Sequence, residues 1–479
     1  MSVDQILIST SPGETRTALL SGGRLVEFLI ERKGRESLVG NIHMGRVTAV
    51  VETIGAAFVS IGQERDGFLA LAEARPAGET GGGIGDFVNE GDAVLVQVQR
   101  DPVEDKGAKL TCHVSLAGAY LIFLPFESGV SVSRRITGGA ERGRLKTLAN
   151  SLAAGQGGCI VRTQAEDADE EDLREDAARL MERWRDIQEK ADAANPPARV
   201  HEGAGLACRA LRDFGGEALR EIVVDDAGAL NRVRGFCDAE MPWLAPLVSL
   251  QKGPDDLFEA TGAAEQIDAA FRPKVGLAGG GSIIIGQTPA LTAIDVNSGE
   301  QDAFKANLEA AAEIARQIRL RNISGLIVVD FLRLKDEGRK KVVLDALKKA
   351  ATADPLVLNV AGFTRLGLVE MTRPRHGLSL MHVVCGPDLL EPVPSVETQA
   401  LEALRRVLIE ASVGMGGKAG VTLRAPEGVI AALKGSGGAD SPAALALTQA
   451  QDRLGLAIGL EPDHTLAEGQ CDITFGNGG

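Results

Sequence analysis

Long hydrophobic runs are absent from this sequence. No stretch approaches the roughly 20 consecutive apolar residues that a membrane-spanning helix needs, and the longest candidate, residues 116–126, is short and broken. The first residues carry no basic segment followed by an apolar core, so we find no signal peptide there. We therefore expect a soluble, cytoplasmic protein that has no membrane partner.

Cysteine is sparse and never clustered. The six cysteines stand singly along the chain, without a CxxC pair. This spacing argues against a disulfide framework and against a preformed zinc site, and it suits a reducing compartment. Two histidines, His376 and His382, precede Cys385, and we interpret both as loop or surface residues.

An excess of basic residues is also lacking, because the net charge is −15. At first sight this counts against a nucleic-acid partner. Phosphate attraction acts over about one Debye length, ~8 Å at physiological salt, so local clusters matter more than the total. Much of the acid lies in residues 166–176, which we interpret as a solvated helix face, and basic residues gather at 134–146 and 333–341. The charge therefore weakens an RNA-binding hypothesis without excluding it.

What is present is the composition of a large globular protein. The 479 residues are 44% hydrophobic and 24% charged, and at about 100–200 residues per domain they predict three or more packed units. Residues 36–116 combine short β-rich runs with Gly-rich turns, and Val94, Val96 and Val98 alternate as in a half-buried strand. Five strands at this spacing predict an OB-like barrel, a common oligonucleotide-binding fold.

Three further segments have simple patterns. A long helix is predicted at about 168–193, before two prolines, and residues 205–273 are mixed α/β. Residues 385–395 contain three prolines and are interpreted as a linker. Beyond it we expect helices near 396–410 and 426–434 and strands near 454–460 and 471–475. The glycines at 279–281 lack the Lys and Ser/Thr of a phosphate-binding loop, so we interpret them as a hairpin turn.

Residues 281–384 are the most informative part of the chain. Strands are predicted at 283–287 and 291–297, followed by a helix whose apolar residues recur at helical spacing: Leu308, Ala311, Ala315 and Ile318. Residues 326–329 then form a continuous apolar run, which is typical of a strand covered on both faces. Strand, helix and strand in this order predict a right-handed crossover with two parallel, adjacent strands.

Polar side chains stand at the ends of these two strands. Asp295 and Asn297 share one strand face, and Asp330 ends the apolar strand. Two converging carboxylates repel each other unless one is protonated or a cation lies between them, and such oxygen ligands favour Mg²⁺. Each Asp could instead simply cap a strand or turn. The spacing alone also leaves open a magnesium-dependent phosphatase.

Longer motifs add a resemblance. Within residues 279–375 these motifs are GGGSIIIGQTPALTAIDVNSGE, NLEAAAEIARQIRLRNISGLIVVDF and RLGLVEMTRPR. Upstream of them stand VGNIHMGRV, AAFVSIGQERDGFL, KGAKLTCHVSLAGAYLIFLP, SRRI and IVRT. Together these motifs resemble the bacterial ribonuclease E/G family. The resemblance covers residues 36–384 well and 396–479 weakly. It implies a multidomain α/β fold with an RNase H-like core (1–35 and 205–273), an inserted S1 (OB-like) barrel (36–118), a 5′-sensor (119–204), a DNase I-like catalytic subdomain (274–384), a linker (385–395) and a small C-terminal α/β domain (396–479).

The resemblance also implies an activity and its residues. The activity is endonucleolytic cleavage of single-stranded RNA in rRNA and mRNA processing and decay, leaving 5′-phosphate and 3′-hydroxyl ends. The metal aspartates match Asp295 and Asp330, the catalytic asparagine matches Asn297, and the metal is Mg²⁺ with Mn²⁺ as an alternative. Arg162 and Thr163 match the pocket for a 5′-monophosphate, where an Arg fork suits a phosphate. A surface Arg beside a strand Thr is the plainer interpretation of this pair.

RNA contacts are implied at five more positions. Phe58, Phe68 and Lys106 match the S1 contacts, since aromatic faces stack unpaired bases. Phenylalanines of a barrel are, however, often core residues. Arg373 and Arg375 match contacts to the RNA backbone, although both could be ordinary solvated arginines.

The sequence departs from the family in two places. The loop at 298–306 (SGEQDAFKA) is shorter than the family pattern, which bears on the shape of the site near the metal. The CPxCxGxG zinc-link is reduced to Cys385, so we expect no structural zinc. A zinc-free homodimer through residues 396–479 is the assembly we expect.

Two other classes of function compete with this interpretation. A non-cleaving RNA-binding regulator would keep the S1 and sensor surfaces but would have no need for clustered carboxylates. A scaffold protein would need an interaction tail rich in Arg or Pro, which the sequence does not contain.

Overall fold

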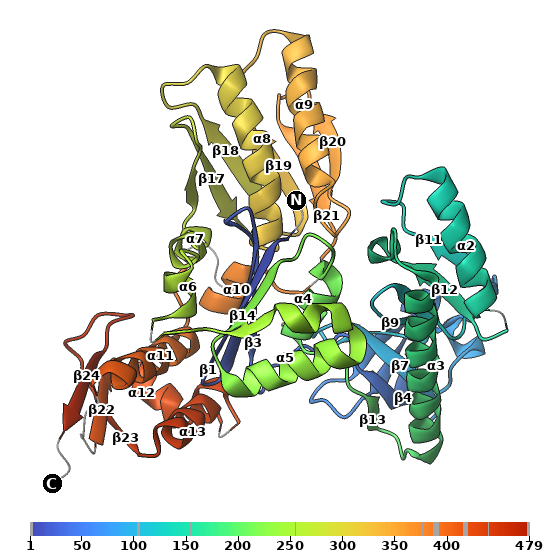
Figure 1. Cartoon of the computed structure of the whole chain (residues 1–479), viewed down its shortest axis with the longest axis horizontal. Helices are drawn as coiled ribbons and strands as arrows, with labels where there is room; N and C mark the ends of the chain where they lie inside the picture. Colours follow the sequence, from blue (N-terminus) through green and yellow to red (C-terminus); the bar gives the residue numbers. More distant parts are fainter. Residues whose placement is uncertain are drawn as a thin grey trace. The chain divides into compact units, whose positions relative to one another are not determined.

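The computed structural model describes residues 3–102, 106–153, 155–253, 255–375, 377–386, 392–414, 420–438 and 440–476 (Figure 1). The chain divides into two compact units. The first unit comprises Met1–Glu36, Glu217–Val233 and Pro246–Gly479, and the second comprises Ser37–Gly216 and Arg234–Ala245. Helix α5 (Ala227–Glu240) begins in the first unit and ends in the second.

The second unit contains a closed barrel, as the sequence predicts. Its strands are β4 (Ile42–Val51), β5 (Ala56–Ser60), β6 (Gly67–Ala70), β7 (Ala93–Arg100) and β8 (Lys109–Thr111). They follow the order β4-β5-β6-β8-β7, and the β4–β7 pairing closes the circle. The core contains Val47, Val59, Leu69, Val96 and Leu110, and β13 (Ala198–His201) adds a strand beside β4. The predicted five-stranded barrel is confirmed.

The second unit also contains a four-stranded sheet and several helices. The strands follow the order β11 (Val130–Val132), β12 (Gly158–Val161), β10 (Leu121–Leu124) and β9 (Leu116–Ala117), and the helices include α2 (Gly139–Ala153), α3 (Glu170–Ala193) and α4 (Leu206–Phe214). Helix α3 confirms the predicted long helix. It buries Leu173, Leu180, Trp184 and Ile187, which recur at helical spacing.

The first unit begins with a five-stranded sheet in the order β15 (Val248–Leu250), β14 (Glu221–Val224), β1 (Gln5–Ser11), β2 (Glu14–Ser21) and β3 (Arg24–Arg32). Short helices α6 (Leu257–Ala260) and α7 (Ala264–Ala270) follow β15 along the chain. The strands β1, β14 and β15 run parallel, whereas β1, β2 and β3 form an antiparallel meander.

The second sheet of the first unit contains six strands. Their order is β16 (Lys274–Gly276), β17 (Ser282–Gln287), β18 (Thr292–Asn297), β19 (Gly325–Asp330), β21 (Val369–Arg373) and β20 (Asn359–Phe363). Helices α8 (Ala303–Leu320) and α9 (Glu337–Ala351) lie together along one face of this sheet (Figure 1). The predicted parallel pair of strands is confirmed, because β18 and β19 are neighbours and run in the same direction.

The expectation that β19 is covered on both faces is wrong. Ile327 and Val329 are buried under the helices, but Leu326, on the opposite face, is 57% exposed. Ile284 on β17 is also exposed on that face. An apolar run can therefore occur on a strand with one solvated face, and the run alone does not reveal how many layers cover the sheet.

The C-terminal part of the first unit is a small α/β module. Strands β23 (Ile458–Pro462), β22 (Gly420–Ala425) and β24 (Asp472–Gly476) pair in that order, and the helices are α11 (Val396–Gly414), α12 (Glu427–Leu433) and α13 (Pro442–Leu454). The two predicted helices and both predicted strands are confirmed, although the first of these strands begins at Ile458 rather than near 454. Helix α13, which ends at Leu454, is not predicted from the sequence. Its Ala-rich sequence packs small side chains such as Ala446 and Ala450 in the core.

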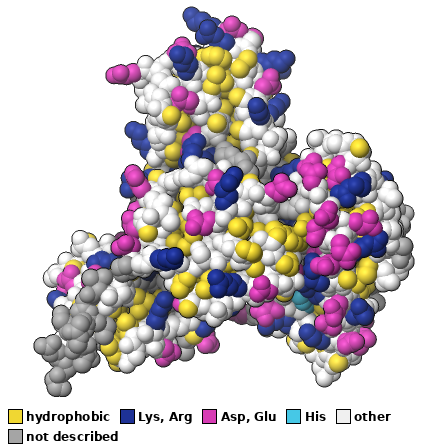
Figure 2. All heavy atoms as spheres, viewed as in Figure 1, with side chains coloured by type: hydrophobic (Ala, Val, Ile, Leu, Met, Phe, Trp, Pro, Cys, Tyr) yellow, Lys and Arg dark blue, Asp and Glu magenta, His cyan; other side chains and the backbone are white. Residues whose placement is uncertain are grey.

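Acidic and basic side chains are interspersed on the surface, as the face in Figure 2 shows. Lys and Arg side chains are visible around the part of the first unit that carries α8 and α9. No helix among the described residues is both long and apolar enough to cross a membrane.

Candidate active site

Asp295 and Asp330 lie in one row of the six-stranded sheet. The parallel register of β18 and β19 pairs the two residues directly. Buried and exposed residues alternate along β18, so Ile294 and Val296 face the helices while Asp295 and Asn297 face solvent. Both aspartates are exposed. The crossover thus brings two carboxylates to the carboxyl edge of adjacent strands, where α/β sheets bind ligands.

Asn297 is joined to this pair. Its amide nitrogen Nδ2 donates a hydrogen bond of 2.8 Å to Oδ2 of Asp295. The bond orients the carboxylate and does not use the amide oxygen of Asn297. Two carboxylates and one amide form a small oxygen-rich donor set of the kind that suits Mg²⁺ completed by water or phosphate oxygens. Among the described residues, no group of three or more His, Cys, Asp or Glu is arranged to hold a metal.

A glycine turn packs against the end of β18. A Cβ on Gly281 would stand 2.6 Å from the carbonyl oxygen of Asn297, and Gly280 has a φ of +91°. Only glycine fits both demands, so the run at 279–281 is the hairpin turn between β16 and β17, as predicted. The short loop after Asn297 then leads directly into α8, where Asp302 caps the helix by accepting from the backbone N–H of Phe304 at 3.0 Å.

Asn307, which no sequence motif singles out, supports the segment after the other aspartate. This residue of α8 is fully buried, with 0% exposure. Its Nδ2 donates to the carbonyl of Leu332 at 2.8 Å, and its Oδ1 accepts from the N–H of Leu332 at 3.0 Å. The two bonds fix the backbone two residues after Asp330. The sequence does indicate that Asn307 is buried, because it lies on the same helical stripe as the apolar Ala311, Ile314 and Ile318.

Arg162 lies at the end of β12 in the second unit and is mostly buried. Its Nη1 donates to the carbonyl of Gly118 at 2.6 Å, and its Nη2 donates to Oδ1 of Asp213 at 2.7 Å. Its neighbour Thr163 shares a hydrogen bond of 2.8 Å with Ser133. Arg162 is therefore a guanidinium fixed by the fold rather than a freely solvated one.

The loop beside Arg162 is held by a buried carboxylate. Asp176 of α3 accepts hydrogen bonds from the backbone N–H groups of Ala119, Tyr120 and Leu121 at 3.1, 2.9 and 2.9 Å. A Cβ on Gly118 would meet its Oδ1 at 2.5 Å. Asp176 thus departs from our interpretation of residues 166–176 as a solvated face, because this one member of the acidic run points into the protein.

The aromatic pair expected on the barrel is present. Phe58 and Phe68 are paired in register on β5 and β6, with ring centroids 6.1 Å apart at 72°. Both are half-buried rather than core residues, so part of each ring faces solvent. Lys106, in the same unit, is exposed.

Arg373 and Arg375 differ although they share one motif. The side chain of Arg373 is 3% exposed, and its Nε and Nη2 bind both oxygens of Asp354 at 2.7 and 3.1 Å. Its Nη1 donates to Oδ1 of Asn322 at 2.7 Å. This buried pairing gives Arg373 a role in the fold, and its RNA contact stays a prediction. Arg375 is exposed, and its RNA contact likewise stays a prediction.

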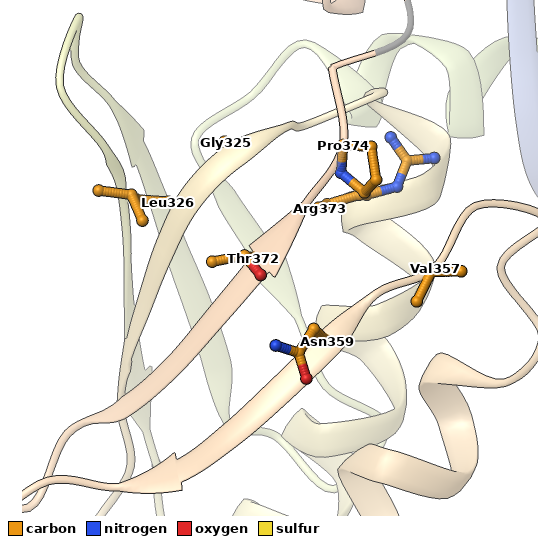
Figure 3. Close-up of a pocket in the computed structure, with 7 residues that line it drawn as sticks. All are labelled: Gly325, Leu326, Val357, Asn359, Thr372, Arg373 and Pro374. Atoms are coloured by element: carbon orange, nitrogen blue, oxygen red, sulfur yellow. The ribbon is translucent and has the colours of Figure 1, made fainter. Parts of the chain in front are cut away.

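A shallow groove lies on the exposed face of the same sheet. It has a volume of about 450 Å³ and is lined by Gly325, Leu326, Val357, Asn359, Thr372, Arg373 and Pro374. In Figure 3, Leu326, Thr372 and Asn359 lie in a row across β19, β21 and β20, while the guanidinium of Arg373 points away from them. The groove is at the amino end of β19, about 13 Å along the strand from Asp330 at ~3.3 Å per residue.

The described residues in or next to the linker include two side chains that could bind zinc, Cys385 and His382. Cys385 ends α10 (Leu380–Cys385), and partial burial raises the pKa of its thiol. Nδ1 of His382 shares a hydrogen bond of 2.9 Å with Ser379, the residue that caps α10. His376 and residues 387–391 of the linker lie outside the described residues.

Comparison with known proteins relates most of the chain to one family. The model of the ribonuclease E/G family matches residues 115–376. Ribonuclease G of Haemophilus influenzae is 37% identical over 430 residues, which cover 85% of this chain and 88% of that protein. Ribonuclease G of Escherichia coli is 36% identical over 426 residues, with 84% and 87% covered. Ribonuclease E of Escherichia coli is 37% identical over 401 residues, or 79% of this chain and 38% of that protein. The chain therefore belongs to the ribonuclease E/G family.

Proposed function

We propose that the protein is a magnesium-dependent endoribonuclease that cleaves single-stranded RNA. The observation that carries this proposal is the row of Asp295 and Asp330, paired in register on adjacent parallel strands, with Asn297 bonded to one of them. Membership of a family whose relatives are named ribonuclease G and ribonuclease E supports RNA as the substrate. The expected products carry 5′-phosphate and 3′-hydroxyl ends.

Each residue of the row has a distinct task in this proposal. Asp295 and Asp330 would hold Mg²⁺, or Mn²⁺ in its place. A metal ion held there would supply activation of a water for attack on phosphorus and charge neutralisation in the transition state. Asn297 keeps the Asp295 carboxylate in one orientation and presents its amide oxygen on the same exposed face. Asn307 keeps Asp330 at its position by fixing the backbone of Leu332.

RNA recognition would involve both units. Arg162 and Thr163 would bind a 5′-monophosphate, which would stimulate cleavage. Phe58 and Phe68 would stack unpaired bases, and Lys106 and Arg375 would contact phosphates. The exposure of Lys106 and Arg375 and the half-exposed rings of the aromatic pair support these roles.

The remaining proposals concern architecture and assembly. We propose that the five-stranded sheet belongs to an RNase H-like core, that the barrel is an S1 domain within residues 36–118, and that residues 274–384 are a DNase I-like catalytic subdomain. We further propose a cytoplasmic protein that forms a zinc-free homodimer through residues 396–479. Metal analysis of the purified protein is expected to find no zinc, whereas about half a zinc per chain, lost in Cys385→Ser, would contradict this.

Cleavage of a labelled single-stranded RNA tests the central proposal. The wild type is expected to cleave the RNA with Mg²⁺ and not to cleave it with EDTA. Asp330→Asn is expected to show no cleavage under either condition. Asp345→Asn, which changes an exposed aspartate of α9, is the matched control and should cleave normally. If RNA binds but wild-type protein never cleaves it, the protein is an RNA-binding regulator instead. Release of terminal phosphate without internal cleavage would identify a phosphatase.

A further inference from the structure

One carboxylate stands where the 5′-phosphate of RNA would have to bind. Oδ1 of Asp213 lies 2.7 Å from Nη2 of Arg162 and 3.9 Å from Nε of Arg212. The side chain of Asp213 is 49% exposed, whereas that of Arg162 is 11% exposed. The carboxylate thus covers the outer edge of a mostly buried guanidinium. The other edge of Arg162 is already used by the carbonyl of Gly118.

The position of Asp213 is unfavourable for its helix. Asp213 lies in the last turn of α4, which ends at Phe214. The carboxyl end of a helix carries partial negative charge, so an acidic side chain is disfavoured there. The ion pair of Asp213 with Arg162 offsets this unfavourable position.

Several charged side chains lie near Arg212, the neighbour of Asp213. Burial lowers the pKa of Arg212, the carboxylates of Asp213 and Glu240 raise it, and the charges of Arg162 and Arg209 lower it. The Nε atoms of Arg209 and Arg212 are buried and donate no hydrogen bond to a described residue. Asp213 is thus a half-exposed carboxylate beside two guanidinium groups, those of Arg162 and Arg212.

The backbone at Asp213 is held, but its side chain can move. Nε2 of Gln164 donates to the carbonyl of Asp213 at 2.8 Å, which ties the segment after Arg162 to α4. Rotation of the half-exposed carboxylate into solvent would therefore uncover Nη2 of Arg162 without moving the backbone. Arg162 itself would stay in place through Gly118.

We propose that Asp213 competes with the 5′-phosphate of RNA for Arg162 and thereby limits the preference for monophosphorylated ends. This inference rests on the proposed function of Arg162. A phosphate monoester carries a charge of about −1.5 to −2 at pH 7, so it is repelled by Asp213 until that carboxylate turns away. An RNA that ends in a 5′-hydroxyl brings no such charge and is not affected. Asp213 would be a specificity-determining residue that touches neither the scissile phosphate nor the catalytic carboxylates.

Binding of two RNAs to the full-length protein tests the proposal. A labelled single-stranded RNA with a 5′-monophosphate is compared with the same RNA bearing a 5′-hydroxyl, by fluorescence anisotropy, in an Asp330→Asn background that prevents cleavage. Asp213→Asn keeps an oxygen that can accept from Arg162 but removes the charge. It is expected to lower the Kd for the 5′-monophosphate RNA about tenfold, because repulsion between charges a few ångströms apart near a protein surface is of that order. The Kd for the 5′-hydroxyl RNA should stay unchanged.

Three further variants make the result unambiguous. Asp213→Glu retains the charge and should keep the wild-type ratio of the two Kd values. Asp186→Asn removes an exposed negative charge of α3 in the same unit and should affect both RNAs equally. Arg162→Ala should abolish the preference for the 5′-monophosphate.

The outcomes separate the inference from the function on which it rests. If Arg162→Ala abolishes the preference but Asp213→Asn leaves it unchanged or weakens it, Arg162 is the sensor and the competition is overturned. If Arg162→Ala leaves the preference intact, the proposed role of Arg162 fails and this inference fails with it. A tenfold gain in Asp213→Asn for both RNAs would show a general charge effect and would also overturn the competition.

Discussion

The two candidate sites of this protein are built in opposite ways. The carboxylates of the first unit belong to one continuous strand–helix–strand segment, β18-α8-β19, and are exposed on a sheet face. The guanidinium of Arg162 in the second unit is mostly buried and is held by Gly118 and Asp213, residues 44 and 51 positions away in sequence. A site within one supersecondary unit can be predicted from periodicity, whereas a site assembled from distant segments reveals its partners only after folding.

The MTRPR motif shows the same contrast within one segment. Arg373 and Arg375 are separated by one proline, yet Arg373 is buried against Asp354 and Arg375 is exposed. Both arginines look alike in the sequence, because the carboxylate that distinguishes them lies 19 residues away. Residue type and motif therefore could not tell which of the two arginines is buried and which is exposed.

The largest effect is expected when this buried pair is broken. Arg373→Ala leaves the Asp354 carboxylate buried without its bidentate partner, and removal of one member of a buried pair costs about 3–5 kcal/mol. Chemical denaturation should show this loss in the first unit. Arg375→Ala is the matched control: its stability should stay within about 0.5 kcal/mol of wild type, since it is a surface substitution. Equal stability of the two variants would contradict the assignment of Arg373.

Asp176→Asn should break the site of the second unit. The change replaces an acceptor of three backbone N–H groups by an amide that must turn one N–H toward them. Loss of charge-assisted bonds to buried donors is expected to destabilise the unit by about 3 kcal/mol. Hydrogen exchange of residues 119–121 is the direct readout. Unchanged protection of these amides would mean that Asp176 does not hold the loop.

Asn307→Ala tests whether α8 supports Asp330. The variant leaves the N–H and carbonyl of Leu332 without their partners, and we expect a loss of about 2–4 kcal/mol in stability. A drop in kcat with little change in KM, measured below the unfolding temperature, would mark a positioning role. Asn307→Asp should retain part of the activity because it still accepts from the N–H of Leu332. Full activity in Asn307→Ala would show that Asn307 does not position Asp330.

Arg162→Ala gives the smallest expected effect. A charge-assisted contact to phosphate is worth about 1.5–3 kcal/mol, which corresponds to roughly a 10–100-fold preference for 5′-monophosphorylated RNA. The ratio of cleavage rates for the two RNA ends measures it. The 5′-hydroxyl substrate serves as the internal control, because its rate should hardly change.

Sequence patterns predicted the elements that are formed by residues close together in the sequence. Apolar spacing located α8, and alternation located a strand of the barrel. The order strand, helix, strand predicted the parallel pair that carries Asp295 and Asp330. Helix α13 was missed because its small alanines give a weak apolar signal. The exposed face of β19 was missed because strand hydrophobicity does not report which faces are covered. Asn307 and Asp213 were missed because their functions depend on partners chosen by tertiary packing.

The central claim is that Asp295 and Asp330 hold one metal ion together. Cleavage rates of Asp295→Asn, Asp330→Asn and the double variant, measured at saturating Mg²⁺, test it most directly. Each single change is expected to cost at least ~10²-fold, because metal charge stabilisation supplies several kcal/mol. If both carboxylates serve the same ion, the double variant should be no slower than the slower single variant, since residues that act as a unit are not additive. Losses that multiply, or a single variant that cleaves at the wild-type rate, would contradict the claim.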